Sequence, residues 1–96
     1  MAADYYAKGI VAIETPSQAH NCLYFMLRDV TQADPVVPNN PWFAVPATQN
    51  GYKEMYAMLL TAWVTGKSVS ARTTGTVAGG ECGNYSLTSE TYIYEP

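Results

Sequence analysis

The stretch NGYKEMYAMLLTAWVTGK, residues 50–67, has the clearest helical periodicity in the sequence. Its large side chains recur at i, i+3, i+4, i+7, i+8 and i+11, which places them on one face of a helix. These residues are Tyr52, Met55, Tyr56, Leu59, Leu60 and Trp63. Asn50 is the expected N-cap and Gly66 the expected C-terminal stop. We predict one helix whose stripe, Trp63 included, packs in the core.

The other face of this helix is unusually low in charge. Its residues are Ala57, Met58, Thr61, Ala62 and Thr65, which are small or apolar and carry no charge. A helix face in contact with water usually carries more charged side chains. We therefore expect a further layer or a second subunit to cover these residues.

Segments on both sides of the helix have the alternation or the aromatic and β-branched content of strands. The expected strands are 4–14, 22–29, 42–46, 67–75 and 85–95. In the first strand Gly9 permits a bend or bulge, and the more apolar set of alternate residues should face the core. That set is Tyr5, Ala7, Gly9, Val11 and Ile13.

The order strand, strand, strand, helix, strand, strand is that of the OB-fold, a small Greek-key barrel. A chain of 96 residues is the size of one domain, so residues 1–96 are expected to form a single OB-fold-like domain. The predicted fold class is mostly β: a five-stranded barrel with one α-helix between strands three and four. The helix stripe would then close the open end of the barrel.

Charge and hydropathy argue against two classes of partner. The formal net charge is −3 at pH 7, whereas a nucleic-acid-binding surface is usually basic. The same charge disfavours binding to an anionic membrane surface. No apolar run approaches the ~18 residues of a membrane span. We expect neither a nucleic-acid partner nor a membrane-spanning segment.

The chain has two cysteines, Cys22 and Cys82. In a cytosolic protein they would be free thiols, but the low charge and the many Tyr, Thr, Asn and Gly residues favour an exported protein with a disulfide. A Cys22–Cys82 bond would close a loop of about 60 residues and stabilise the fold by ~4 kcal/mol. The expected location is secreted or periplasmic.

Several segments together resemble a known family. They are DYYAKGIVAIE (4–14), CLYFMLRD (22–29), YAMLLTAWVTGKSVSAR (56–72) and a cysteine near a late loop. This pattern is similar to the receptor-binding B subunits of bacterial AB5 toxins, in the subtilase-cytotoxin and pertussis-like branch, and to small exported bacterial OB-fold relatives. The resemblance implies a pentameric ring with its helices around a central pore, binding to cell-surface glycans, and a catalytic A subunit as partner.

The resemblance also implies a position for the glycan site. In the subtilase-type B subunit, an Asp and a Ser at the start of the first strand hold the sugar. Asp4 stands at the position of that Asp, and Lys8 replaces the Ser. Thr73 or Thr74 lies near the position of a family Tyr. The implied glycan-binding residues are therefore Asp4, Lys8, Thr73 and Thr74.

Groups suited to catalysis are sparse. The single histidine, His20, lies in a polar turn, where the sequence provides no oriented partner for a general base. One His and two distant Cys do not have the spacing of a zinc site. The carboxylates are scattered along the chain without a visible pair. We expect no enzymatic activity, no metal site and no cofactor.

Two functions remain open from the sequence. The first is an exported carbohydrate-binding subunit that tethers or delivers a partner to cell-surface glycans. The second is an exported domain of the same shape that binds a protein, as an inhibitor or envelope component. The many aromatic residues, the low charge and the toxin-subunit resemblance favour the first.

Overall fold

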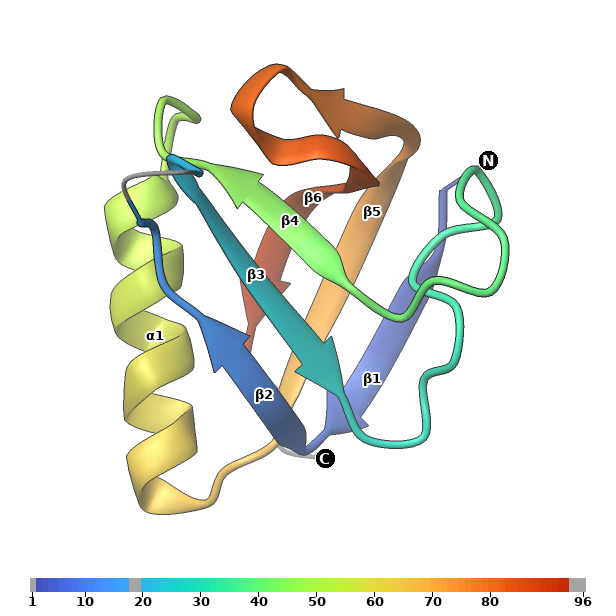
Figure 1. Cartoon of the computed structure of the whole chain (residues 1–96). Helices are drawn as coiled ribbons and strands as arrows, with labels where there is room; N and C mark the ends of the chain where they lie inside the picture. Colours follow the sequence, from blue (N-terminus) through green and yellow to red (C-terminus); the bar gives the residue numbers. More distant parts are fainter. Residues whose placement is uncertain (1, 18–19, 94–96) are drawn as a thin grey trace.

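The computed structural model describes residues 2–17 and 20–93, a mostly β fold with one α-helix (Figure 1). The strands are β1 (Asp4–Lys8), β2 (Ile10–Glu14), β3 (Cys22–Leu27), β4 (Phe43–Pro46), β5 (Val69–Gly79) and β6 (Gly83–Tyr92). Helix α1 (Tyr52–Thr65) separates β4 from β5, and the 3-10 turn η1 (Gly80–Cys82) separates β5 from β6. In this described part of the chain, no helix has the length and hydropathy of a membrane span. The predicted residues Tyr94 and Glu95 of the last strand lie outside the described residues.

All strands belong to one mixed sheet, in the order β1-β5-β6-β4-β3-β2. Neighbouring strands are antiparallel except β4 and β6, which are parallel. The sheet therefore has six strands and is open between β1 and β2. The expected five-stranded closed barrel is not confirmed, whereas the mostly β class with a single helix between the strands is.

The sixth strand arises because the expected strand 4–14 divides at Gly9. β1 pairs with β5, and β2 pairs with β3, with a register shift in each ladder. Ala7 has a positive φ of 51°, which interrupts the alternation of side chains along the segment. The inward set predicted for this strand is therefore partly wrong: Ile10 is buried, whereas Val11 is exposed.

The core lies between the sheet, helix α1 and the loop 28–42. At its centre the rings of Phe25 and Phe43 are stacked, with centroids 4.8 Å apart, and Tyr5 packs edge-on against Phe43. Strand β3 is buried on both faces, as its apolar sequence predicts. Leu59 and Ala62 are the helix residues buried in this core.

The helix has a different rotation about its axis from the one predicted. Leu59 is fully buried and Ala62 is 1% exposed, but Trp63 is 51% exposed. The prediction that Trp63 packs in the core is wrong. The apolar residues of this helix cover a wide arc, and the buried part is displaced toward Ala62, whose small side chain lets the helix lie close to the sheet.

The sequence predicted the C-terminal end of the helix correctly and the N-terminal end wrongly. Gly66 is the C-cap in the left-handed conformation, and its N–H donates to the carbonyl of Ala62. At the other end the N-cap is Gly51, without a side-chain cap, so the assignment of Asn50 as N-cap is wrong. Gly51 has a φ of 84°, which glycine adopts without the steric cost of a Cβ.

The loop 28–42 is fixed to the sheet by a buried carboxylate. Asp34 is fully buried and accepts hydrogen bonds from the backbone N–H groups of Val36 (3.0 Å) and Gly75 (2.8 Å). The hydroxyl of Tyr5 donates to the carbonyl of Gln32 in the same loop. Burial, and secondarily the charge of Asp34, raises the pKa of Tyr5. The tyrosine therefore stays a neutral donor at neutral pH.

Candidate functional site

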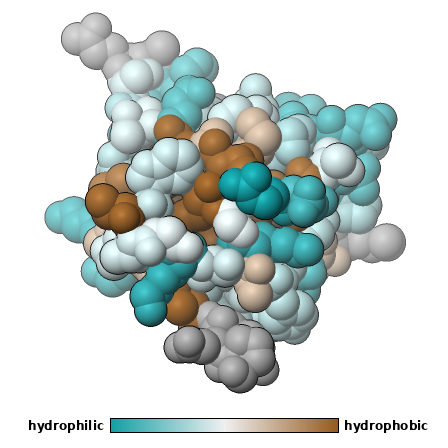
Figure 2. Space-filling view, turned by 90° about the horizontal axis from the view of Figure 1, so that it is seen from below, coloured by the Kyte–Doolittle hydropathy of each residue, from teal (hydrophilic) through white to brown (hydrophobic). Residues whose placement is uncertain are grey.

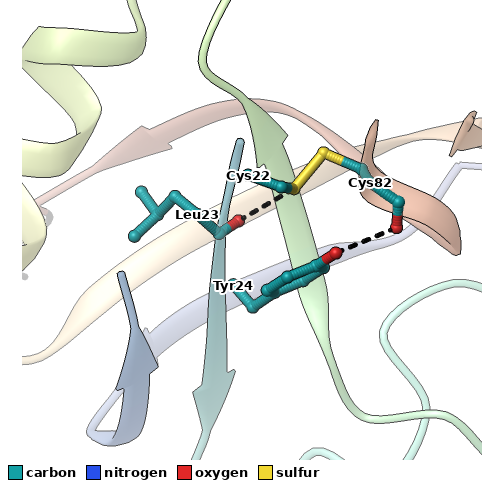
Figure 3. The surroundings of a disulfide bond; sticks show 4 residues. All are labelled: Cys22, Leu23, Tyr24 and Cys82. Atoms are coloured by element: carbon teal, nitrogen blue, oxygen red, sulfur yellow. Dashed lines mark hydrogen bonds between the residues drawn. A yellow bond between two sulfur atoms is a disulfide. The ribbon is translucent and has the colours of Figure 1, made fainter. Parts of the chain in front are cut away.

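The predicted disulfide between Cys22 and Cys82 is present, with the two Cα atoms 5.3 Å apart (Figure 3). It connects the first residue of β3 to η1, just before β6 begins. The Sγ of Cys22, which carries no hydrogen in the disulfide, also lies 3.6 Å from the carbonyl oxygen of Leu23. Disulfides are typical of proteins from oxidising compartments, which agrees with a location outside the cytoplasm.

A cluster of aromatic rings lies beside this disulfide. Tyr24 is at its centre, and its hydroxyl donates a 3.1 Å hydrogen bond to the carbonyl of Cys82 (Figure 3). The ring of Tyr24 contacts those of Tyr85, Trp42 and His20 at centroid distances of 5.0, 6.5 and 6.4 Å. The disulfide and this hydrogen bond together hold the central ring in one orientation.

These rings surround a small cavity of about 160 Å³. Strand pairing explains how its wall forms: Glu14 is the cross-strand partner of Tyr24 in the β2–β3 ladder. The parallel pairing of Phe43 with Ser86 brings together the residues just before them, Trp42 and Tyr85. The complete lining is Glu14, His20, Tyr24, Trp42 and Tyr85.

The cavity combines apolar ring surfaces with a few polar groups. Burial raises the pKa of Tyr24, and the neighbouring Tyr85 and Glu14 raise it further. Its hydroxyl is thus a neutral donor that is already used, so Tyr24 offers a ring and no free hydroxyl. The side chains of Glu14 and His20 are exposed and supply a carboxylate acceptor and an imidazole at the rim. Such a cavity suits a ligand with an apolar face and hydroxyl groups at its edge.

His20 forms no ion pair within the described residues. In residues 2–17 and 20–93, the imidazole of His20 has a ring contact with Tyr24 and no hydrogen-bonded carboxylate. The same residues contain no group of three or more His, Cys, Asp and Glu side chains that could hold a metal ion.

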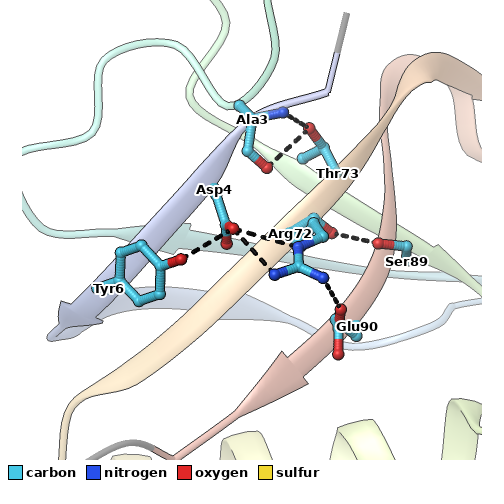
Figure 4. Close-up of polar contacts among 7 residues, drawn as sticks. All are labelled: Ala3, Asp4, Tyr6, Arg72, Thr73, Ser89 and Glu90. Atoms are coloured by element: carbon cyan, nitrogen blue, oxygen red, sulfur yellow. Dashed lines mark hydrogen bonds and ion pairs between the residues drawn. The ribbon is translucent and has the colours of Figure 1, made fainter.

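The residues implied for the glycan site by resemblance lie elsewhere, along β1 and β5 (Figure 4). Asp4 forms an ion pair with Arg72 at 3.0 Å, and Arg72 also contacts Glu90 at 2.6 Å. The hydrogen bond and the charge of Asp4 raise the pKa of Arg72, and Glu90 adds to this effect. The carboxylate of Asp4 is thus already engaged by a cation of its own chain.

Of the other three implied residues, only Thr73 lies near Asp4. Thr73 is buried, and its hydroxyl accepts a 2.9 Å hydrogen bond from the N–H of Ala3 (Figure 4). Thr74 is exposed and shares a 2.7 Å hydrogen bond with the hydroxyl of Thr76. Lys8 is at the opposite end of β1, where it pairs with Val69. The structure brings together Asp4 and Thr73 only, with both side chains occupied.

The residues expected to contact a neighbouring subunit divide into two groups. Ala57, Thr61 and Thr65 are exposed. Met58 is partly buried against the core, and Ala62 is buried within it, so Ala62 as an interface residue is a wrong prediction. The displaced helix rotation is the cause of this error.

The exposed helix face is more apolar than its sequence alone indicates. The hydroxyl of Thr61 donates to the carbonyl of Ala57 (2.8 Å), and that of Thr65 to the carbonyl of Thr61 (2.7 Å). Both hydroxyl groups therefore donate to carbonyls of the helix itself. Leu60, Trp63 and Val64 are exposed beside them.

Comparison of the chain with protein-family models, curated protein sequences and solved structures finds no match.

The aromatic pocket was missed by sequence reasoning. That reasoning placed His20 in a polar turn and counted Glu14 among carboxylates scattered along the chain. One sequence signal was available, since Tyr24 lies within the predicted strand 22–29 and Trp42 begins the next predicted strand, 42–46.

Proposed function

We propose that the protein is an exported carbohydrate-binding domain, with an OB-fold-like barrel similar to the B subunits of AB5 toxins. The strand order supports the barrel: the two edge strands, β1 and β2, are consecutive halves of one segment and are separated only by Gly9. A sheet whose edges are covalently adjacent in this way can curl until they meet. The disulfide supports export.

The aromatic pocket is the observation that carries the glycan proposal. OB-folds bind oligosaccharides and oligonucleotides on the face formed by their second and third strands and adjoining loops. The equivalent strands here are β3 and β4, which contribute Tyr24 and the preceding Trp42. The net charge of −3 disfavours an oligonucleotide. A sugar ring could rest its C–H face on these rings while Glu14 and His20 bond its hydroxyl groups.

Substitution of the pocket should abolish glycan binding. Trp42→Ala removes a ring from the cavity wall, and we expect loss of signal on a glycan array for every sugar that the wild type binds. Asp4→Asn is the matched control, because it changes the site implied by resemblance and leaves the aromatic pocket intact. Circular dichroism checks that both variants are folded.

A glycan site on β1 and a glycan site in the aromatic pocket predict opposite results for these two variants. Loss of binding in Asp4→Asn with retention in Trp42→Ala would place the glycan on β1 and would contradict the aromatic site. Failure of the wild type to bind any sugar on the array would contradict the carbohydrate proposal altogether.

Self-assembly into a ring is the second part of the proposal. The exposed face of Ala57, Leu60, Thr61, Trp63 and Val64 is the surface that a neighbouring copy would cover. Sedimentation should give a mass well above that of the monomer, with a pentamer expected. Thr61→Glu should weaken assembly, since like charges around a common axis repel at low dielectric. A catalytic A subunit remains the expected partner of such a ring.

Thr31→Glu is the control for this experiment, since Thr31 is exposed in the loop 28–42, away from the helix. A wild type that sediments as a monomer at tens of micromolar would rule out the ring. The exposed apolar face would then favour the alternative function, binding of a protein partner by an exported domain of this shape.

A further inference from the structure

A second and larger cavity lies at the opposite end of the β2–β3 hairpin from the aromatic pocket. It has a volume of about 480 Å³, within the usual range for small-molecule sites. Figure 2 shows the molecule from below the view of Figure 1. This is the side where the C-terminal end of α1 and the turn between β1 and β2 lie, and hydrophobic residues there are bordered by hydrophilic ones. The side chains that define its chemistry are Lys8, Arg28, Asp29, Trp63, Lys67 and Ser68.

The cavity concentrates positive charge in an acidic protein. Three of the five Lys and Arg residues of the chain line it, Lys8, Arg28 and Lys67, against one carboxylate, Asp29. In the part of the chain that the structure describes, the ion pairs involve Arg72, and none involves these three cations. Cations that line a cavity in excess of carboxylates, and that form no ion pair, are suited to an anionic ligand.

Two features give this cationic cavity a defined shape. The backbone N–H of Arg28 donates to the carbonyl of Gly9 at 2.7 Å. A Cβ atom at position 9 would lie 3.4 Å from Nε of Arg28, so the guanidinium stem packs directly over the glycine. On the other side Trp63, half-exposed, supplies an aromatic surface from the last turn of α1. The cavity thus offers charge and a flat apolar wall together.

We propose that this cavity binds a small organic anion, a carboxylate or phosphate attached to a ring that contacts Trp63. The three cations bind the anionic group, and the remaining volume of the cavity accommodates the ring. A lone inorganic ion has no such ring to contact Trp63. This inference is independent of the glycan proposal, because the two cavities share no residue.

Amide NMR titration of the wild-type protein tests the site with benzoate and phenyl phosphate as probes. Benzyl alcohol is the neutral control, and inorganic phosphate is the control without a ring. We expect saturable shifts at the amides of Gly9, Gly66 and Ser68 and at the Trp63 indole, with both ring-bearing anions. Arg28→Gln and Lys67→Gln should each weaken binding about ten-fold, as expected when a charge-assisted hydrogen bond is lost.

Lys53→Gln is the matched control, because Lys53 is an exposed lysine in the first turn of the helix and does not line the cavity. It should leave the affinity unchanged, and added salt should weaken binding. Equal effects of all three substitutions would show diffuse charge attraction and overturn the proposal. Binding of inorganic phosphate as tight as that of phenyl phosphate, or shifts with benzyl alcohol of equal size, would also overturn it.

Discussion

Removal of the Cys22–Cys82 disulfide is expected to lower the free energy of unfolding by about 4 kcal/mol, on the chain-entropy model for a bond that closes a loop of this length. The cysteines are 60 residues apart, so the bond restricts a large part of the unfolded chain. Both cysteines are buried, which shields the bond from reductant in the folded state. Urea unfolding of the double variant Cys22→Ala/Cys82→Ala against the wild type measures this loss.

Chemical reduction of the wild type provides the control, since it removes the bond and keeps every other atom. Both preparations should lose a similar free energy, and the intact wild type should have a mass two protons below that of the reduced chain. A loss below ~1 kcal/mol in both, the range of ordinary surface substitutions with some margin, would mean that the bond adds little to stability. Two free thiols in protein exported to an oxidising compartment would contradict the disulfide itself.

Much of the secondary structure could be predicted because its signals are local. The apolar segment 22–27 and the period of the helix define their elements within a few neighbouring residues. Gly66 ends the helix as expected, because glycine readily adopts the left-handed conformation needed there. The disulfide was predictable because the chain contains just two cysteines.

The features that escaped prediction depend on distant contacts. After Gly9 the side chains that face the core change from one alternate set to the other. This change occurs because β1 pairs with β5, whereas β2, on the other side of Gly9, pairs with β3. Asp34 is buried because loop 28–42 reaches Gly75, far along the chain. Neither the strand pairing around Gly9 nor the contact of Asp34 with Gly75 can be read from the local pattern of residues.

The aromatic pocket escaped for a similar reason. Trp42 and Tyr85 line the same pocket because β4 and β6 pair in parallel, although the two residues are far apart in the sequence. The resemblance indicated Asp4, but it could not show that Arg72 occupies that carboxylate, because the ion pair joins residues 68 positions apart. That a glycan site in this chain is aromatic and low in charge stays a prediction, which binding data test.

Leu59→Ala should lower the free energy of unfolding by ~2–5 kcal/mol, whereas Leu60→Ala should cost less than ~1 kcal/mol. The two residues are adjacent and chemically identical, so helix propensity and the change in volume cancel between them. Only their positions differ: Leu59 is fully buried, and Leu60 is 41% exposed. Urea unfolding at a single pH compares the two variants with the wild type.

The same comparison decides how the helix is rotated. Trp63→Ala is the third member, and its cost should stay near that of Leu60→Ala because half of its surface already contacts water. A loss of ~3–5 kcal/mol for Trp63→Ala would restore the rotation expected from the sequence, with the whole stripe buried. That result would also remove the aromatic wall of the anion cavity and the exposed face of the proposed ring. A small loss leaves Trp63 exposed on the single chain, where it can either contact a neighbouring copy or line the proposed anion cavity.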